Sequence, residues 1–104
     1  MFKIKKFSEL TGLTVRTLQY YDEIELLTPT RDNNGHRMYS AEDLIKINEI
    51  ILMKNMGLSL ENIITQVNNK ENKSLEDSLI RQEALLKRQM GDIQNQLHQV
   101  RELI

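Results

Sequence analysis

The stretch Leu10-Thr-Gly-Leu-Thr-Val-Arg-Thr-Leu-Gln-Tyr-Tyr-Asp22 decides the fold of this 104-residue chain. Gly12 is suited to end one short helix, because glycine readily takes the left-handed conformation that closes a helix. Thr14 is suited to cap a second helix, which we expect to end between residues 22 and 24. Two short helices joined by a Gly-containing turn predict a helix-turn-helix, a pattern that many helical proteins share.

A hairpin signal follows this helix pair. Thr28-Pro29 ends the helical region, and Asn34-Gly35 is a strong two-residue hairpin turn signal, in which both residues take positive φ angles. A small hairpin that carries two Arg and a Tyr directly after a helix-turn-helix indicates a winged helix. The predicted fold class is therefore mainly α: a winged helix-turn-helix with a small β-hairpin wing and a long C-terminal coiled-coil helix.

Three further segments share one opening, in which a Ser suited to cap a helix precedes polar side chains that favour its first turn. They are Ser40-Ala-Glu-Asp43, Ser59-Leu-Glu-Asn62 and Ser74-Leu-Glu-Asp77. These openings predict helices at about residues 41–56, 60–68 and 75–104. The run 69–73 contains no apolar residue and is predicted to be a polar linker.

The last predicted helix carries an apolar seam with heptad spacing. The seam residues are Leu79, Leu86, Met90, Ile93, Leu97, Val100 and Ile104. About 30 residues make a helix of roughly 45 Å, too long to be buried against the rest of so short a chain. We therefore expect a homodimer through this helix, since symmetric dimers are the commonest oligomers. Packing on its own body or on a further domain is the alternative.

The net charge of −1, from 14 Lys+Arg and 15 Asp+Glu, at first argues against a nucleic-acid partner. Binding depends on where the charges lie, however, rather than on their total. Residues 1–21 hold three more cations than anions, and the segment 28–40 holds one more. A basic face of this kind suits phosphate binding, although a solvated surface of mixed sign fits the charge count equally well.

Several function classes are excluded or disfavoured by composition. The absence of Cys excludes disulfides, thiolate metal sites and a Cys nucleophile. His36 and His98 lie far apart, without an acidic cluster at ligand spacing, so we expect no metal, no cofactor and no enzymatic activity. No stretch reaches the roughly 18 apolar residues of a membrane span, and the N-terminus has no secretory signal, so we expect a cytoplasmic protein without membrane contact.

Candidate recognition residues lie on the second helix. At 100° per residue, Arg16, Thr17 and Tyr20 share its outer side, opposite Val15 and Leu18. Arg can bind guanine through two hydrogen bonds, and Tyr and Thr side chains reach phosphates. The alternative is a solvated Arg beside a partly buried Tyr.

Together these motifs resemble the signature of the MerR family of bacterial transcription regulators. The matching segments are Leu10–Leu27, Asn34–Ser40, Ala41–Leu44 and Met56–Ile63. The resemblance spans about residues 2–68, and the long last helix is similar to the dimerisation helix of the family. It implies a DNA-binding domain at 1–68, a linker at 69–73 and an antiparallel coiled-coil dimerisation helix at 74–104.

The resemblance also implies a function. Family members bind double-stranded promoter DNA as homodimers and distort an overlong spacer, so that RNA polymerase engages both promoter elements. The positions implied to contact DNA are Thr14, Arg16, Thr17, Tyr20, Tyr21, Arg37, Tyr39 and Lys54. For Tyr39, packing of the hairpin against the next helix is an equal alternative. An excisionase-like architectural adapter, or a coiled-coil interaction module, is the alternative function.

The chain departs from the family pattern at three positions. Gln19 stands where the family often has Arg, Lys3 replaces a frequent Ser or Thr cap, and Glu25 replaces a frequent Gly. The multidrug-sensing branch tolerates the last change, and the absence of Cys excludes the thiolate metal-sensing branch. We expect either a truncated chain or a minimal member that has no effector domain.

Overall fold

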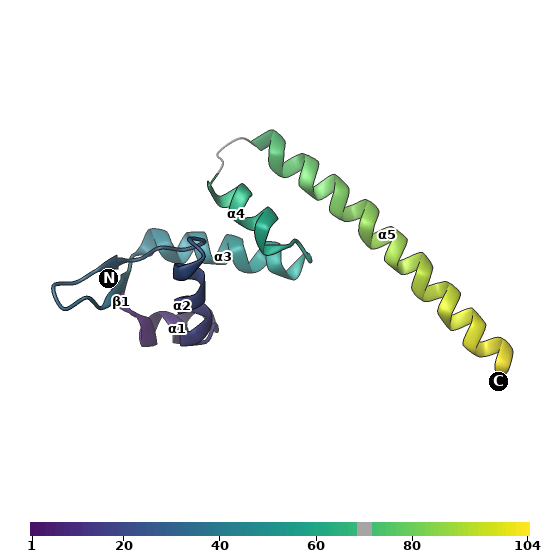
Figure 1. The fold of residues 1–104 in the computed structure, drawn as a ribbon, viewed down its shortest axis with the longest axis horizontal. Helices are drawn as coiled ribbons and strands as arrows, with labels where there is room; N and C mark the ends of the chain where they lie inside the picture. The colour runs from purple at the N-terminus through teal and green to yellow at the C-terminus, as the bar shows by residue number, and fades with distance from the viewer. Residues whose placement is uncertain (69–71) are drawn as a thin grey trace. The chain divides into compact units, whose positions relative to one another are not determined.

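The computed structural model describes residues 1–68 and 72–104, which fall into two units, Met1–Lys70 and Glu71–Ile104. The elements of the first unit are β1 (Phe2–Lys3), α1 (Ile4–Thr11), α2 (Val15–Glu23), β2 (Thr30–Arg31), β3 (Arg37–Tyr39), α3 (Ala41–Asn55) and α4 (Leu60–Asn68). The second unit consists of α5 (Asn72–Leu103) (Figure 1). Among the described residues, no helix has the length and apolar character needed to cross a membrane.

Local signals predicted the helix pair correctly. Gly12 ends α1 with a φ of 76° and donates its N–H to the Ser8 carbonyl. Thr14 caps α2, because its side chain accepts the N–H of Thr17 at 3.0 Å. α2 ends at Glu23, inside the expected range. The helix-turn-helix is therefore confirmed.

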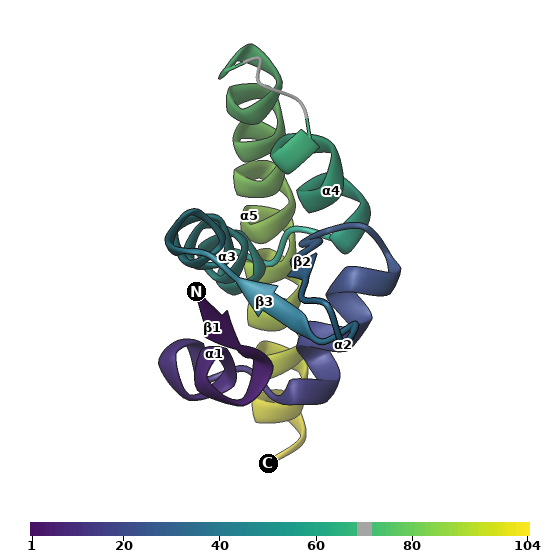
Figure 2. The ribbon, with the colours of Figure 1, turned by 90° about the vertical axis from the view of Figure 1, so that its left-hand side faces the viewer.

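The wing, the hairpin of β2 and β3, is part of a three-stranded antiparallel sheet in the order β1-β3-β2 (Figure 2). The sequence predicted the hairpin of β2 and β3, which pairs Arg31 with Arg37. It did not predict β1, in which Phe2 pairs with Tyr39, because two residues are too few to show an alternating pattern. This third strand attaches the hairpin to the start of α1.

The turn of the hairpin differs from the predicted two-residue turn. Gly35 has a φ of 79°, but Asn34 is not among the residues with positive φ. Gly35 instead donates its N–H to the Asp32 carbonyl, and the Asp32 N–H donates to the His36 carbonyl, which leaves a three-residue loop. The Asp32 carboxylate explains the difference, because it accepts the N–H groups of Asn34 and His36, each at 2.9 Å.

The next two helices agree with the predicted bounds to within one residue. Ser40 and Asp43 form a reciprocal capping box at the start of α3. At its end, Gly57 donates to the Lys54 carbonyl and Leu58 donates to the Met53 carbonyl, the two bonds of a Schellman motif.

The apolar core of the first unit is built around α1, which contacts β1, β3, α2 and α3. The ring of Phe7 is fully buried and stacks on Tyr39 with 4.2 Å between the ring centroids. The other fully or almost fully buried apolar side chains are Leu18, Leu26, Leu27, Ile47, Ile50 and Ile63. The wing is thus attached to the helix pair through apolar packing.

α5 is a continuous helix of 32 residues, about 48 Å long at 1.5 Å per residue. It begins at Asn72, so the predicted start after Ser74 is wrong, and Ser74 lies inside the helix. The sequence from residue 68 to residue 74 contains no Gly or Pro, so nothing in it prevents the helix from beginning before Ser74. Residues 69–71 of the predicted linker lie outside the described residues, whereas 72 and 73 belong to α5.

Candidate nucleic-acid interface

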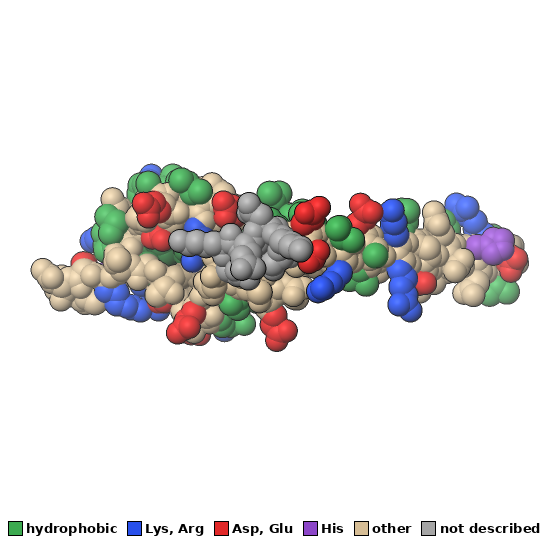
Figure 3. All heavy atoms as spheres, turned by 90° about the horizontal axis from the view of Figure 1, so that it is seen from above, with side chains coloured by type: hydrophobic (Ala, Val, Ile, Leu, Met, Phe, Trp, Pro, Cys, Tyr) green, Lys and Arg blue, Asp and Glu red, His purple; other side chains and the backbone are tan. Residues whose placement is uncertain are grey.

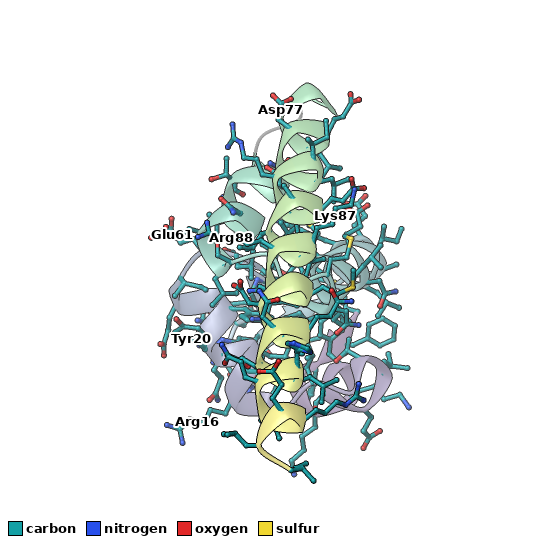
Figure 4. The ribbon with its side chains drawn as sticks, turned by 90° about the vertical axis from the view of Figure 1, so that its right-hand side faces the viewer. Arg16, Tyr20, Glu61, Asp77, Lys87 and Arg88 are labelled. Atoms are coloured by element: carbon teal, nitrogen blue, oxygen red, sulfur yellow. The ribbon has the colours of Figure 1, made fainter. Side chains whose placement is uncertain are left out.

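The outer face of α2 presents a cation and a phenol to solvent. Arg16 is exposed and Tyr20 is 46% exposed. Figure 4 shows both side chains projecting outward from α2 on the same side. A helix with these groups near its N-terminal half can contact base edges and phosphates.

Thr14 and Thr17 are bonded to each other at the start of α2. The Thr14 hydroxyl lies 2.9 Å from the Thr17 hydroxyl and also accepts the Thr17 N–H. Thr14 remains exposed, while Thr17 is half-buried. The two hydroxyls therefore hold the helix end, and the Thr17 hydroxyl keeps a proton that it could donate to a phosphate oxygen.

The wing is held to α2 by a carboxylate. Asp22, in the last turn of α2, accepts Arg37 Nε at 2.7 Å and Arg31 Nη2 at 3.0 Å, both on Oδ2. The Asp22 side chain is only 12% exposed, so these charge-assisted bonds are partly shielded from water. Sequence reasoning missed this contact, because no local pattern pairs Asp22 with residues nine and fifteen positions along the chain.

Tyr21 and Tyr39 lie inside the unit rather than on its surface. Tyr21 is 6% exposed, and burial raises the pKa of its phenol, with a smaller contribution from Tyr20. Tyr39 is fully buried, and burial likewise raises its pKa. Its hydroxyl has no hydrogen-bond partner among the described residues. The packing alternative for Tyr39 is therefore the arrangement that the structure contains.

Lys54 lies exposed in the last turn of α3, just before the Gly57 turn. A cation at this end of a helix is favoured by the helix dipole, independently of any ligand. Its exposed ammonium group is also available to a phosphate. Among the described residues, no three His, Asp or Glu are grouped so that they could hold a metal ion.

α5, considered alone, presents the predicted seam to solvent. The seven seam residues are between 37% and 98% exposed. Figure 3 shows apolar side chains along α5 between charged ones. Ile80, Leu85 and Leu103 are also exposed but lie outside the seam, and the heptad pattern did not predict a role for them. Glu83 of the same helix forms an ion pair with Lys87 at 3.2 Å.

Comparison with known proteins agrees with this geometry. The family model described as "MerR HTH family regulatory protein" matches residues 2–70. The HTH-type transcriptional activator mta of Bacillus subtilis is 38% identical over 63 residues, which cover 60% of this chain and 24% of that activator. The chain therefore matches about a quarter of that relative's length.

Two solved structures are similar to this chain. The N-terminus of the Bacillus subtilis multidrug transporter activator, MtaN, aligns with a TM-score of 0.90 and 28% identity over 100% of this chain and 99% of that one. EcmrR, solved in a complex with DNA, aligns with a TM-score of 0.83 and 27% identity over 97% of this chain and 37% of that one.

Proposed function

This chain belongs to the MerR HTH family of regulatory proteins, and we propose that it regulates transcription by binding promoter DNA as a homodimer. The observation that carries the proposal is the pairing of an exposed recognition face with a fixed wing. Arg16 and Tyr20 project from α2, while Asp22 of the same helix holds the wing through Arg37. A rigid pair of elements can contact the major groove and the adjacent backbone together.

Each proposed contact has a separate role. Arg16 reads guanine in the major groove, and Tyr20, Thr14 and Thr17 hold phosphates beside it. Lys54, at the end of α3, contacts backbone on the far side of the helix pair. Arg37 mainly positions the wing, since its Nε is already bonded to Asp22. Tyr21 and Tyr39 support these residues from the core.

A homodimer is proposed from the exposed seam of α5. Seven apolar side chains along one side of α5 expose too much apolar surface for an isolated helix in water. A second copy, packed antiparallel, would cover the same residues on both helices. It would also present two copies of the DNA-binding unit to two half-sites.

Two half-sites on a promoter with an overlong spacer allow regulation by deformation of the DNA. We propose that the bound dimer distorts the spacer so that RNA polymerase engages both promoter elements. Shortening the spacer by about two base pairs should then make transcription independent of the protein. A promoter that responds equally at every spacer length would contradict this mechanism.

The proposed DNA binding is tested by fluorescence anisotropy on the promoter region of the protein's own gene, over a series of salt concentrations. We expect saturable binding that weakens steeply with salt. Arg16→Ala removes one bidentate base contact from each half-site, so it should weaken binding by the dimer at least about 30-fold. Equal affinity for the promoter and for random DNA at every salt concentration would contradict a sequence-specific regulator. The adapter alternative is not favoured, since the similar protein mta of Bacillus subtilis is a transcriptional activator.

A further inference from the structure

A cleft with a cavity volume of about 480 Å³ lies between the start of the chain, α2 and the wing. Its walls include Lys3 and Lys5 from the β1–α1 junction, Gln19 from α2, and His36 and Arg37 from the wing. No carboxylate is among the lining residues. The electrostatic character of this cleft is therefore positive, although the whole chain is close to neutral.

The two lysines of the cleft are unpaired. Among the described residues, neither Lys3 nor Lys5 has a carboxylate within the 4.0 Å of an ion pair, and both side chains are exposed. The third lysine of this segment, Lys6, is different: it lies 3.9 Å from Glu9 and does not line the cleft. The cleft thus has two cations that no carboxylate within residues 1–68 and 72–104 neutralises, as far as the structure describes them.

The cleft is continuous with the recognition face of α2. Gln19 lies about 60° from Arg16 and about 60° from Asp22 around the helix, at 100° per residue. It therefore stands between the base-reading side chain and the side chain that holds the wing. DNA that contacts Arg16 would pass its backbone across Gln19 toward the wing.

We propose that this cleft receives the sugar–phosphate backbone of bound DNA, with Lys3 and Lys5 neutralising one phosphodiester and the Gln19 amide donating a hydrogen bond to it. The proposal rests on the DNA binding proposed above and extends it to Lys3 and Lys5, which lie outside the recognition helix. Ile4 also lines the cleft, and an apolar side chain there suits a deoxyribose ring beside the phosphate. Gln19 supplies a neutral contact in place of a third cation.

The test compares wild type with the double variant Lys3→Gln, Lys5→Gln, using anisotropy titrations of promoter DNA at several salt concentrations. One phosphodiester per protomer means two per dimer, so the slope of log K against log salt should become shallower by about two. Affinity at low salt should fall about tenfold or more, equally for promoter and random DNA, because phosphate contacts carry no sequence information.

Lys6→Gln is the control, because it removes one positive charge from the same segment without changing the cleft. The proposal would be overturned if the double variant changed the salt slope by no more than twice the change that Lys6→Gln causes. Circular dichroism of each variant checks that the helices remain. A wild type that binds no DNA at any salt concentration would instead contradict the proposed function itself.

A titration with inorganic phosphate tests whether the cleft binds a free phosphate ion or the phosphodiester of DNA. Calorimetric titration of wild type with phosphate should give no saturable binding at millimolar concentrations, since one free anion lacks the neighbouring sugar and phosphates. Phosphate binding that the double variant loses, together with an unchanged DNA salt slope, would overturn the assignment to DNA.

Discussion

Asp22 Oδ2 accepts Arg37 Nε at 2.7 Å, so the last turn of α2 is bonded directly to β3 of the wing. The same oxygen accepts Arg31 at 3.0 Å, so one carboxylate holds both wing arginines. The angle between α2 and the wing is therefore set by the protein before any ligand binds. A contact surface that is already arranged loses less conformational entropy on binding.

Replacing Asp22 by Asn tests this positioning role. The variant keeps the size of the side chain but loses the charge, so we expect the free energy of unfolding to fall by about 1 kcal/mol. The released arginines should bind phosphates of any sequence, so the ratio of promoter to random DNA affinity should fall about tenfold. Urea denaturation and anisotropy measure the two effects.

Glu23→Gln is the control for this variant. It removes the same charge one residue later, from an exposed side chain that has no ion pair among the described residues. We expect little change in its stability or in its discrimination between sequences. Equal effects from the two variants would show that the charge of the segment matters and that the contact with Arg37 does not.

Tyr39→Phe separates the packing role of Tyr39 from phosphate binding. The ring is fully buried against Phe7, and its hydroxyl has no partner among the described residues. Removing that hydroxyl should leave the protein equally stable or more stable by about 1 kcal/mol, because an unsatisfied polar group is lost from the core. DNA affinity should change less than about twofold, within roughly 0.4 kcal/mol. A tenfold loss of affinity at unchanged stability would show that the hydroxyl reaches the DNA.

Local patterns accounted for most of the helix ends, because capping depends on residues within one turn of each other. The capping box of Ser40 and Asp43 and the left-handed Gly12 are examples in which the sequence alone predicted the observed contact or conformation. The same reasoning placed the start of α5 incorrectly at Ser74. A residue suited to cap a helix does not fix where the helix begins when the residues before it can also be helical.

The tertiary contacts of the site could not be predicted in this way. Asp22 contacts residues nine and fifteen positions away, and no local pattern assigns those partners. Charge counting treated Arg31 and Arg37 as free cations, although the structure pairs both with Asp22. The cleft that Lys3 and Lys5 line likewise depends on β1, a two-residue strand without a sequence pattern.

Glu25 offers a direct test of backbone strain at the end of α2. It has a φ of 59°, the left-handed conformation that glycine adopts without steric cost. Its N–H donates to the Asp22 carbonyl, and the next residue, Leu26, donates to the Tyr21 carbonyl, which completes a Schellman motif. Glu25→Gly should therefore stabilise the protein by about 0.5–1 kcal/mol in urea denaturation. Glu23→Gly, inside the helix, should destabilise it by a similar amount, and a loss of stability in Glu25→Gly would contradict strain at this position.

The turn of the wing should respond to acid through Asp32. The N–H groups of His36 and Asn34 donate to its carboxylate, and these bonds hold the pKa of Asp32 below its ordinary value of 3.8. A lowered pKa in the folded state means that the carboxylate stabilises the turn above pH 3.8 and loses this effect as pH falls through the lower value. The amide signal of Asn34 in NMR spectra, which reports on its bond to the Asp32 carboxylate, should keep its position down to about pH 4 and then shift. Asp32→Asn should abolish that acid transition, and a wild-type Asn34 signal that shows no transition below pH 4 would contradict this assignment.

The seam of α5 makes the dimer testable by charge insertion. Leu86 and Leu97 are 48% and 46% exposed in the single chain, and a partner helix would bury both. Leu86→Asp with Leu97→Asp would place a carboxylate in the apolar interface at each position, at a cost of several kcal/mol per dimer. We expect wild type to sediment at about twice 12.2 kDa and this variant to sediment as a monomer without promoter affinity.

Ile80→Asp with Leu85→Asp is the matched control, because these exposed residues lie outside the seam and their replacement should leave the dimer intact. A wild type that is monomeric at micromolar concentration, or a control that dissociates as readily as the seam variant, would refute dimerisation through this seam.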